Sequence, residues 1–170
     1  MKKKLDEIAN FEWDHIQKRY VYDFIPKENN RWIRLRTNGD KTTLTIKSIV
    51  SSEIDGTKEL EITVDDFSKT HLILKELGYV EKGYQENRRI QYSYDGVEID
   101  IDFWPKIPAY LEIEGSSEDE VYKVVELLGF DKNDCTSRDV EGIFLDYGHN
   151  LDEIYNLKFE EERKWHYLKN

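Results

Sequence analysis

Apolar and polar side chains alternate strictly along two neighbouring runs of the chain, 31–36 and 42–47. Such alternation predicts β-strands, because successive side chains of a strand point to opposite faces of a sheet. An Asn-Gly-Asp sequence at 38–40 favours a tight turn, so the two runs are predicted to form a β-hairpin. The basic residues on the polar face of this hairpin are Arg34, Arg36 and Lys47.

The same alternation recurs further along the chain and predicts four more strands. A run rich in aromatic and β-branched residues at 16–25, which Pro26 ends, predicts another strand before the hairpin. An Asp-Gly pair at 95–96 predicts a second hairpin between two of the later strands. The later alternating runs lie at 58–64, 88–94, 97–102 and 110–114.

Helical spacing and end signals predict two well-defined helices. The first follows Asp66 and ends before Gly78, and the second begins at the capping-box pair Ser117 and Glu120 and ends before Gly129. Weaker apolar spacing predicts a short amphipathic helix near the N-terminus and short helices after residue 134. The charged run from 160 onward is expected to be a solvated helix or a frayed end. The N-terminal apolar residues at helical spacing are Leu5, Ile8 and Phe11.

The strand at 58–64 with its helix resembles the strand at 110–114 with its helix. Leu-Glu-Ile and Leu-Gly-Tyr begin at residues 60 and 77, and Leu-Glu-Ile and Leu-Gly-Phe begin at residues 111 and 128. Both pairs of motifs are separated by the same offset. The repetition indicates an internal duplication, or two structurally equivalent halves.

If each strand turns its aliphatic residues toward the helices, the opposite face of the sheet collects many charges. One explanation is a sheet with one face in water, where alternation and cross-strand ion pairs are ordinary. The other is a ligand site, which the doublets Arg-x-Arg, Glu-x-Glu and Asp-x-Asp favour over the mixed polar residues of a merely wet face. The charged residues are Arg34, Arg36, Lys47, Arg89, Glu59, Glu61, Glu98, Asp100, Asp102, Glu112 and Glu114.

A sheet with helices on one side can curl until its polar face closes into a barrel with a charged interior. Unpaired charge in such an interior is costly, so the barrel would require ions or ligands. Arginine and lysine clamp phosphates, while carboxylates hold a Mg²⁺ or Mn²⁺ ion that bridges phosphate oxygens. The charge pattern therefore suits a polyphosphate accompanied by a divalent metal.

Composition narrows the partners and the setting of the protein. A chain of 170 residues suffices for one domain, and its formal net charge of -11 argues against non-specific binding to nucleic acid or to anionic lipid. No run has the length of a membrane span, and no apolar signal segment follows Met1. The single cysteine, Cys135, excludes an intramolecular disulfide, so we expect a cytoplasmic protein.

Other kinds of chemistry are not indicated by the sequence. The histidines lack the spacing of metal ligands, and Cys135 has neither a neighbouring histidine nor a second cysteine to act as a nucleophile. There is no glycine-rich phosphate loop. We expect structural or surface roles for the histidines, including His71 in the first predicted helix.

Taken together, the strand motifs resemble the CYTH superfamily, the triphosphate tunnel metalloenzymes, which include class IV adenylyl cyclases, thiamine triphosphatases and inorganic tripolyphosphatases. The resemblance covers about residues 16–130 and rests on the order and spacing of the motifs. They are Tyr20-Val-Tyr-Asp23, Arg34-x-Arg36, Thr45-x-Lys47, Glu59-x-Glu61, Arg88-Arg89, Asp100-x-Asp102 and Ile107-Pro108-x-x-Leu111-Glu-Ile-Glu114.

The resemblance implies an α+β fold: an antiparallel β-barrel forming a triphosphate tunnel, or a half-open barrel, with helices packed outside. We expect one domain over 1–170, with a C-terminal helical segment at 131–170. The residues implied as triphosphate ligands are Arg34, Arg36, Lys47 and Arg89. The implied ligands of Mg²⁺ or Mn²⁺ are Glu112 and Glu114, with Glu59, Glu61, Asp100 and Asp102 in support. The resemblance assigns no catalytic residue.

One family feature is missing from the sequence. Family members usually begin with a Glu-x-Glu-x-Lys strand that supplies two metal-binding carboxylates and a lysine, whereas here Met-Lys-Lys-Lys-Leu-Asp-Glu precedes the matching part. Either the sequence starts downstream of that strand, or the protein is a divergent member with a barrel open on one side. An open barrel has an unpaired edge, which a second copy in a homodimer or the C-terminal segment would cover.

Two functional hypotheses follow from the resemblance. In the first, the protein binds a small-molecule triphosphate (ATP, thiamine triphosphate or tripolyphosphate) with a divalent metal and cleaves it as a hydrolase or an adenylyl cyclase. The sequence does not separate these two reactions, because both use the same phosphate ligands. In the second, the domain binds nucleotide or polyphosphate without turning it over, because the first metal-binding strand is missing.

Overall fold

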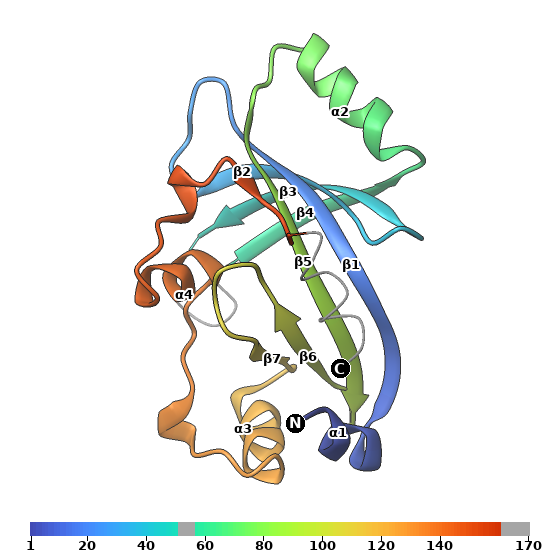
Figure 1. Cartoon of the computed structure of the whole chain (residues 1–170), viewed down its shortest axis with the longest axis vertical. Coiled ribbons are helices and arrows are strands. Elements are labelled where there is room, and N and C mark those ends of the chain that lie inside the picture. Colours follow the sequence, from blue (N-terminus) through green and yellow to red (C-terminus); the bar gives the residue numbers. More distant parts are fainter. Residues whose placement is uncertain (51–56, 161–170) are drawn as a thin grey trace.

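Eight strands form one sheet in the part of the chain that the structure, a computed structural model, describes: residues 1–50 and 57–160 (Figure 1). Seven strands follow the order β4-β3-β2-β1-β5-β6-β7 with antiparallel neighbours, and β8 pairs with β5 in parallel. The strands are β1 (Asn10–Asp23), β2 (Arg31–Thr37), β3 (Thr42–Ile49), β4 (Thr57–Val64), β5 (Glu81–Tyr94), β6 (Val97–Phe103), β7 (Tyr110–Glu114) and β8 (Asn156–Leu157). The helices are α1 (Lys2–Ile8), α2 (Phe67–Glu76), α3 (Glu118–Leu127) and α4 (Val140–Asp146), with 3₁₀ turns at Lys132–Asp134 and Leu151–Glu153.

The two long strands β1 and β5 form the centre of the sheet and run side by side through the molecule (Figure 1). Strands β2 to β4 continue the sheet from β1, and strands β6 and β7 continue it from β5. Helix α2 lies toward one end of the long axis, and helices α1 and α3 lie at the other end (Figure 1). The chain therefore builds one group of strands on each side of a central pair.

Both predicted hairpins are confirmed. In the first turn Gly39 has a φ of +97°, and the side chain of Asn38 accepts two backbone hydrogen bonds of 3.1 and 2.8 Å. In the second turn Asp95 and Gly96 have φ angles of 50° and 83°. Positive φ at both central residues suits a two-residue hairpin, because the twist of such a turn matches the twist of the strands that it joins.

The repeated sequence segments become the two edges of the sheet. Edge strand β4 is followed by α2 and edge strand β7 is followed by α3, and each of these helices has 10 residues. Both helices end alike, with a left-handed glycine after the last turn: Gly78 has a φ of +91° and Gly129 a φ of +83°. The next residue then donates its N–H to a carbonyl of the helix. The prediction of two structurally equivalent units is therefore confirmed.

The aliphatic residues of the strands pack in clusters with the helices and the C-terminal segment. We call strands β2–β4 with α2 the first unit, and strands β6 and β7 with α3 the second unit. In the first unit, Leu35 of β2 is buried in one cluster with Leu74 of α2. In the second unit Ile99 of β6 is buried with Val124 of α3. A third cluster gathers the C-terminal segment around Trp104, which is 2% exposed. In the first two clusters the strands thus turn their aliphatic face toward the helices, as the alternation predicts.

Some local expectations are wrong. Helix α1 ends at Ile8, and Phe11 belongs to β1, which begins at Asn10 rather than at residue 16. The reason lies far away in sequence, because this part of β1 pairs with the end of β5. Leu60 and Ile62 on the aliphatic side of β4 are 68% and 56% exposed, so α2 does not cover this edge of the sheet.

The second unit differs from the prediction at two ends. Ser117 caps α3 by accepting the N–H of Glu120, but the Glu120 carboxylate accepts from the N–H of Ser116 instead of completing a capping box. Strand β5 begins at Glu81 rather than at residue 88, because its first half pairs with β1 and not with β6. With this extra length, β5 pairs with β1 along nearly its whole length and with β6 along its second half.

The C-terminal segment returns to the sheet and adds a strand to the helices expected there. After α4, the residues Asn156 and Leu157 pair with β5 beyond the end of β6. None of the described helices is both long and apolar enough to cross a bilayer. The solvated or frayed end predicted from residue 160 lies, from 161 onward, outside the described residues.

The sheet does not close into a barrel. Strands β4 and β7 are the two ends of the strand order, and no strand within the described ranges pairs with the outer edge of either. The fold is therefore an α+β half-open barrel, which is one of the two forms predicted. One side of the polar face stays bordered by two unpaired strand edges.

His71 joins α2 to the sheet and has the structural role that was expected. Its ring stacks on Tyr20 with centroids 4.0 Å apart, and its Nδ1 lies 2.7 Å from the hydroxyl of the fully buried Tyr22. Burial lowers the pKa of His71 below its ordinary value of 6.5, and the nearby Lys75 adds to the effect against the opposing charge of Glu81. The neutral imidazole is therefore the form that the fold favours.

This lowered pKa predicts a loss of stability in acid. Because the unfolded chain takes up the histidine proton first, stability should fall as the pH drops from about 7 to about 5, and the slope should flatten in His71→Gln, which cannot titrate. Thermal unfolding midpoints of both proteins across this pH range measure the difference. Parallel curves for the two proteins would show that His71 does not contribute.

Candidate functional site

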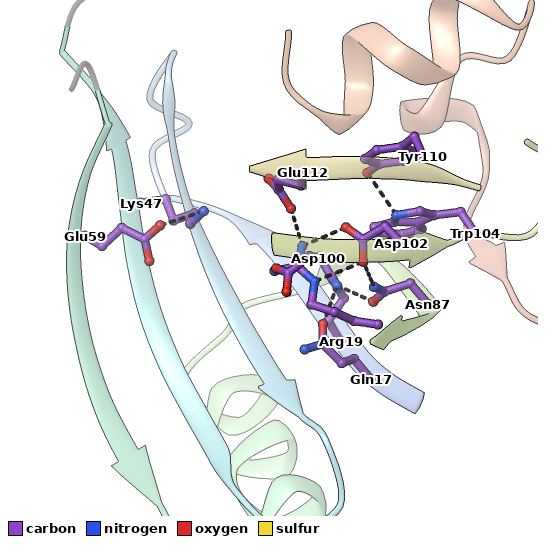
Figure 2. Close-up of polar contacts among 11 residues, drawn as sticks. Gln17, Arg19, Lys47, Glu59, Asn87, Asp100, Asp102, Trp104, Tyr110 and Glu112 are labelled. Atoms are coloured by element: carbon purple, nitrogen blue, oxygen red, sulfur yellow. Dashed lines mark hydrogen bonds and ion pairs between the residues drawn. The ribbon is translucent and has the colours of Figure 1, made fainter. Parts of the chain in front are cut away.

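Cross-strand pairing places the charged residues on one face of the sheet, which we call the charged face. Directly opposite residues share a face, and Arg36 lies opposite Arg19, while Arg89 lies opposite Asp102. Figure 2 shows Lys47 with Glu59 on one side and the acids of β6 and β7 on the other, with side chains directed toward the space between them. From β4 to β7 the polar residues of this face include Glu59, Glu61, Thr43, Thr45, Lys47, Arg34, Arg36, His15, Gln17, Arg19, Gln85, Asn87, Arg89, Asp100, Asp102, Glu112 and Glu114.

Arg89 of β5 contacts acidic residues of both β6 and β7. Its Nε and Nη2 donate to the two oxygens of Asp102 at 2.9 and 2.7 Å, a bidentate arrangement. Nη2 also donates to Glu112, and Nη1 lies 2.5 Å from Oδ2 of Asp100. We call Arg89, Asp100, Asp102 and Glu112 the acidic cluster.

One guanidinium does not balance the acids of the acidic cluster. Burial raises the pKa of Asp100 to about 8, since the attraction of Arg89 is opposed by the repulsion of Glu98 and Asp102. Burial also raises the pKa of Glu112, where Asp102 and Glu114 add repulsion against the same arginine. The cluster therefore keeps excess negative charge, which protons or a further cation can neutralise.

The basic residues of β2 and β3 form a second group with the glutamates of β4. Lys47 lies 2.7 Å from Glu59, and Arg34 lies 3.5 Å from Glu59 and 3.8 Å from Glu61. The hydroxyl of Thr45 donates to Glu61 at 2.7 Å. We call Arg34, Lys47, Glu59 and Glu61 the basic cluster; its cations are more buried than its acids, because the side chains of Arg34 and Glu59 are 10% and 39% exposed.

Most of the residues predicted from the sequence belong to one of these two clusters. Arg36 makes no ion pair with a described residue, but its pKa is lowered by burial and by Arg89, and raised by Glu61, Glu59 and Glu112. These influences come from both clusters, so Arg36 lies between them. Glu114 is exposed at the end of β7 and joins neither cluster. Its predicted role as a metal ligand stays a prediction, as do the ligand roles of the other residues.

The sequence as a whole was then compared with known proteins. A sequence model of the CYTH domain matches residues 12–138, which is most of the chain. The chain belongs to the CYTH family. No curated protein sequence shows significant similarity to it.

Solved structures share the fold of this CYTH chain. The PH1012 protein from Pyrococcus horikoshii is 23% identical, with a TM-score of 0.68 over 81% of this chain and 88% of that chain. A candidate adenylate cyclase from Vibrio parahaemolyticus is 12% identical, with a TM-score of 0.69 over 85% and 89%. A candidate adenylyl cyclase from Hippeastrum, described as having a dominant triphosphatase activity, is 17% identical, with a TM-score of 0.57 over 90% and 91%.

The structure adds Arg19 of β1 to the charged face of the CYTH chain. Its Nη2 donates to Gln17 and Asn87, and its guanidinium lies 4.7 Å from the centre of the Trp104 ring. Within the described ranges no carboxylate forms an ion pair with Arg19, and its Nε is buried without an acceptor. Burial lowers the pKa of Arg19 to about 9, and repulsion from Arg34, Arg36 and Arg89 contributes.

The sequence contains only a weak signal for Arg19. It lies in the aromatic run that predicts a strand, where Gln17 and Arg19 alternate with the exposed Lys18, so either set could have been turned outward. The pairing of β1 with β5 decides the matter, because it sets Gln17 opposite Asn87 on the charged face. That pairing joins residues far apart in sequence, and the local pattern does not contain it.

The donors of the acidic cluster fit a hard divalent cation, which prefers carboxylate oxygens. Asp100 is 1% exposed, neither of its oxygens forms a hydrogen bond of good geometry, and Glu112 lies directly opposite it on β7. A buried carboxylate whose only cationic partner among the described residues is shared with two other acids is a group that a further cation would satisfy. Among the described residues no three acidic, histidine or cysteine side chains surround one point as a metal site. Arg89 lies between the acids instead.

The pairing in the acidic cluster predicts unequal effects of two acidic residues on stability. Asp102→Ala should cost about 1.5–3 kcal/mol, because it removes the bidentate partner of a buried guanidinium that keeps only Asp100 and Glu112. Glu59→Ala should cost less than about 1 kcal/mol, because Glu59 is partly exposed. Urea unfolding of both variants measures the costs. Similar small losses would show that the Arg89–Asp102 contact is not a structural requirement.

Proposed function

We propose that the charged face binds the phosphate chain of a small-molecule triphosphate in the cytoplasm and cleaves it with the help of a divalent metal. The observation that carries this proposal is the gathering of Arg19, Arg34, Arg36 and Arg89 on one face. Burial and mutual repulsion lower the pKa of the first three. A polyanion among these groups would relieve the repulsion and accept several charge-assisted hydrogen bonds at once.

The basic groups lie within reach of such a ligand. The side chains of Arg34, Lys47 and Arg89 are 10%, 21% and 15% exposed, so each is largely desolvated yet open at one side. Partial desolvation strengthens their attraction for phosphate oxygens. The open edge between β4 and β7 leaves the face accessible from that side.

Hydrolysis of the terminal phosphate is the reaction that the charged face supports best. Water attacks the terminal phosphorus, and the bond from that phosphorus to the bridging oxygen breaks. The products are orthophosphate and the diphosphate form of the substrate. Arg34, Lys47 and Arg89 would orient the phosphate chain and stabilise the charge that develops on its oxygens. Asp100 and Glu112 would hold the metal, with Glu114 predicted from the family, and the bound metal would supply charge neutralisation at the phosphate oxygens.

Family membership and fold support this reading. CYTH proteins in general depend on a divalent metal and bind triphosphate substrates, and the relative from Hippeastrum is described as having a dominant triphosphatase activity. The triphosphatase activity described for the relative from Hippeastrum favours hydrolysis over cyclisation. Trp32, which lies opposite Lys47 and is partly exposed, is the aromatic residue of this face that a nucleobase could still contact. Trp104 lies beneath Arg19 and donates its N–H to the hydroxyl of Tyr110 at 3.1 Å, so it does not offer a free surface to a nucleobase.

The proposed function predicts turnover of a triphosphate and a loss of binding in variants of its basic residues. Incubation with tripolyphosphate, thiamine triphosphate or ATP and Mg²⁺ or Mn²⁺ should release orthophosphate. Arg34→Ala and Lys47→Ala should each weaken binding of tripolyphosphate about tenfold or more, because each removes a charge-assisted contact. Arg31→Ala is the matched control, since Arg31 lies on the same strand but pairs with Glu28 and projects from the opposite face.

The possible products separate the alternatives. Cyclic AMP and diphosphate from ATP would assign a cyclase, and binding without any product would assign a non-catalytic binding module. If both variants bind tripolyphosphate as the wild type does, the charged face is only a solvated sheet surface, and the proposal fails. Isothermal titration calorimetry measures binding, and phosphate and cyclic nucleotide assays measure turnover.

A variant of Arg19 distinguishes a role in tripolyphosphate binding from a role in stability. Arg19→Met should weaken tripolyphosphate binding about tenfold or more, while stability is kept or increased, because a buried cation without an acidic partner is costly to fold. Calorimetric titration and urea unfolding of the same variant give the two values. A variant that binds normally but loses stability would show that Arg19 is a packing residue.

A further inference from the structure

The contacts of Arg89 use the same carboxylates that suit a divalent cation. Its nitrogens reach both oxygens of Asp102, one oxygen of Asp100 and one oxygen of Glu112. We propose that Arg89 and a divalent cation compete for Asp100 and Glu112, so that the metal binds tightly only when Arg89 has turned from these acids to a phosphate chain. The proposal rests on the proposed function only for the destination of Arg89.

Geometry makes the two cations exclusive. A planar guanidinium directs its N–H groups to fixed positions in its own plane, and here the contacts extend from β6 to β7. A metal ion would have to approach the oxygens of Asp100 and Glu112, which lie opposite each other across these strands. Arg89 contacts both of these acids, so a metal there would meet an arginine of like charge.

Charge explains why neither cation alone satisfies the acids. Arg89 carries one positive charge and faces three acidic side chains, and the carboxylate of Asp100 is left without a hydrogen bond of good geometry. A divalent ion would neutralise more of this charge. The divalent ion can reach Asp100 and Glu112 only when Arg89 breaks its contacts with them. The bidentate contact of Arg89 with Asp102 opposes this movement.

The neighbouring arginines determine what can draw Arg89 away. Burial lowers the pKa of Arg19, Arg34 and Arg36, and repulsion from Arg89 adds to the effect in each case. Arg89 would approach these cations only with a polyanion between them. A triphosphate that binds Arg89 would thus free Asp100 and Glu112 from their contacts with this arginine. The metal and the triphosphate would therefore bind cooperatively. By linkage, the energy that couples the two ligands would be carried by Arg89.

The test uses Mn²⁺ alone with the full chain and no phosphate, and it follows the electron paramagnetic resonance signal of free Mn²⁺. Arg89→Gln should bind Mn²⁺ about tenfold more tightly than the wild type, because the competitor is gone. Arg31→Gln is the matched control: it removes an arginine that lies on the opposite face of β2 and pairs with Glu28, so it should change affinity by less than about threefold. Adding Asp100→Asn to Arg89→Gln should abolish the gain.

Equal Mn²⁺ affinity in the wild type and in a folded Arg89→Gln would overturn the proposal, and so would an equal gain in Arg31→Gln. If Arg89→Gln does not fold, as circular dichroism would show, the wild type provides the second test. The arginine Nε–Hε resonance of Arg89, assigned with Arg89→Lys, should shift with tripolyphosphate in the presence of a chelator and stay in place with Mg²⁺ alone. The reverse pattern would contradict the competition.

The outcomes are distinct from those of the proposed function. The Mn²⁺ titration contains no triphosphate, so its failure leaves the binding of tripolyphosphate to the basic cluster unaffected. Conversely, a chain that does not bind tripolyphosphate could still show the competition between Arg89 and Mn²⁺. In that case Arg89 would compete with a metal ion at a site that does not serve triphosphate binding.

Discussion

The contact of Arg89 with the acids of β6 and β7 is the interaction on which the charged face depends. Strict alternation puts a carboxylate at every second position of these strands, and burying such groups without a counter-charge would be prohibitive. Arg89 supplies that charge through its bidentate contact with Asp102. Asn87 extends the network, because it donates to Asp102 and accepts from Arg19. The acids are therefore held in place by a residue that is also suited to bind phosphate.

The two equivalent units of the fold carry opposite charge balances. In the first unit the glutamates of β4 are outnumbered by the cations around them, since Arg34 and Lys47 are joined by Arg19 and Arg36. In the second unit the acids outnumber their cation, because among the described residues only Arg89 forms ion pairs with Asp100, Asp102 and Glu112. A phosphate chain on the first unit and a metal on the second would correct both imbalances together. Two similar strand–helix units thus give two complementary halves of the proposed site.

Local sequence patterns predicted much of this architecture, because strand alternation, Asn-Gly and Asp-Gly turns and helix caps are short-range features. Arg34, Lys47 and Glu59 were placed on one face for this reason, and the structure brings them together. The pairing partner of a strand is not a short-range feature. Arg19 was missed because the pairing of β1 with β5 fixes which side it faces, and the exposure of Leu60 was missed because alternation does not say where a helix will lie.

The residues that β1 contributes to the charged face give Arg89 additional importance. Strand β1 presents His15, Gln17 and Arg19 to the charged face, so none of these positions supplies a carboxylate. Within the described strands, the more buried acids suited to a metal are those that Arg89 already contacts, since Glu114 is exposed and the glutamates of β4 lie among cations. In a barrel with further acids, a metal could bind without disturbing this arginine. Here Arg89, the proposed phosphate ligand, contacts Asp100 and Glu112, the proposed metal ligands, so a change in one half of the proposed site would alter the other.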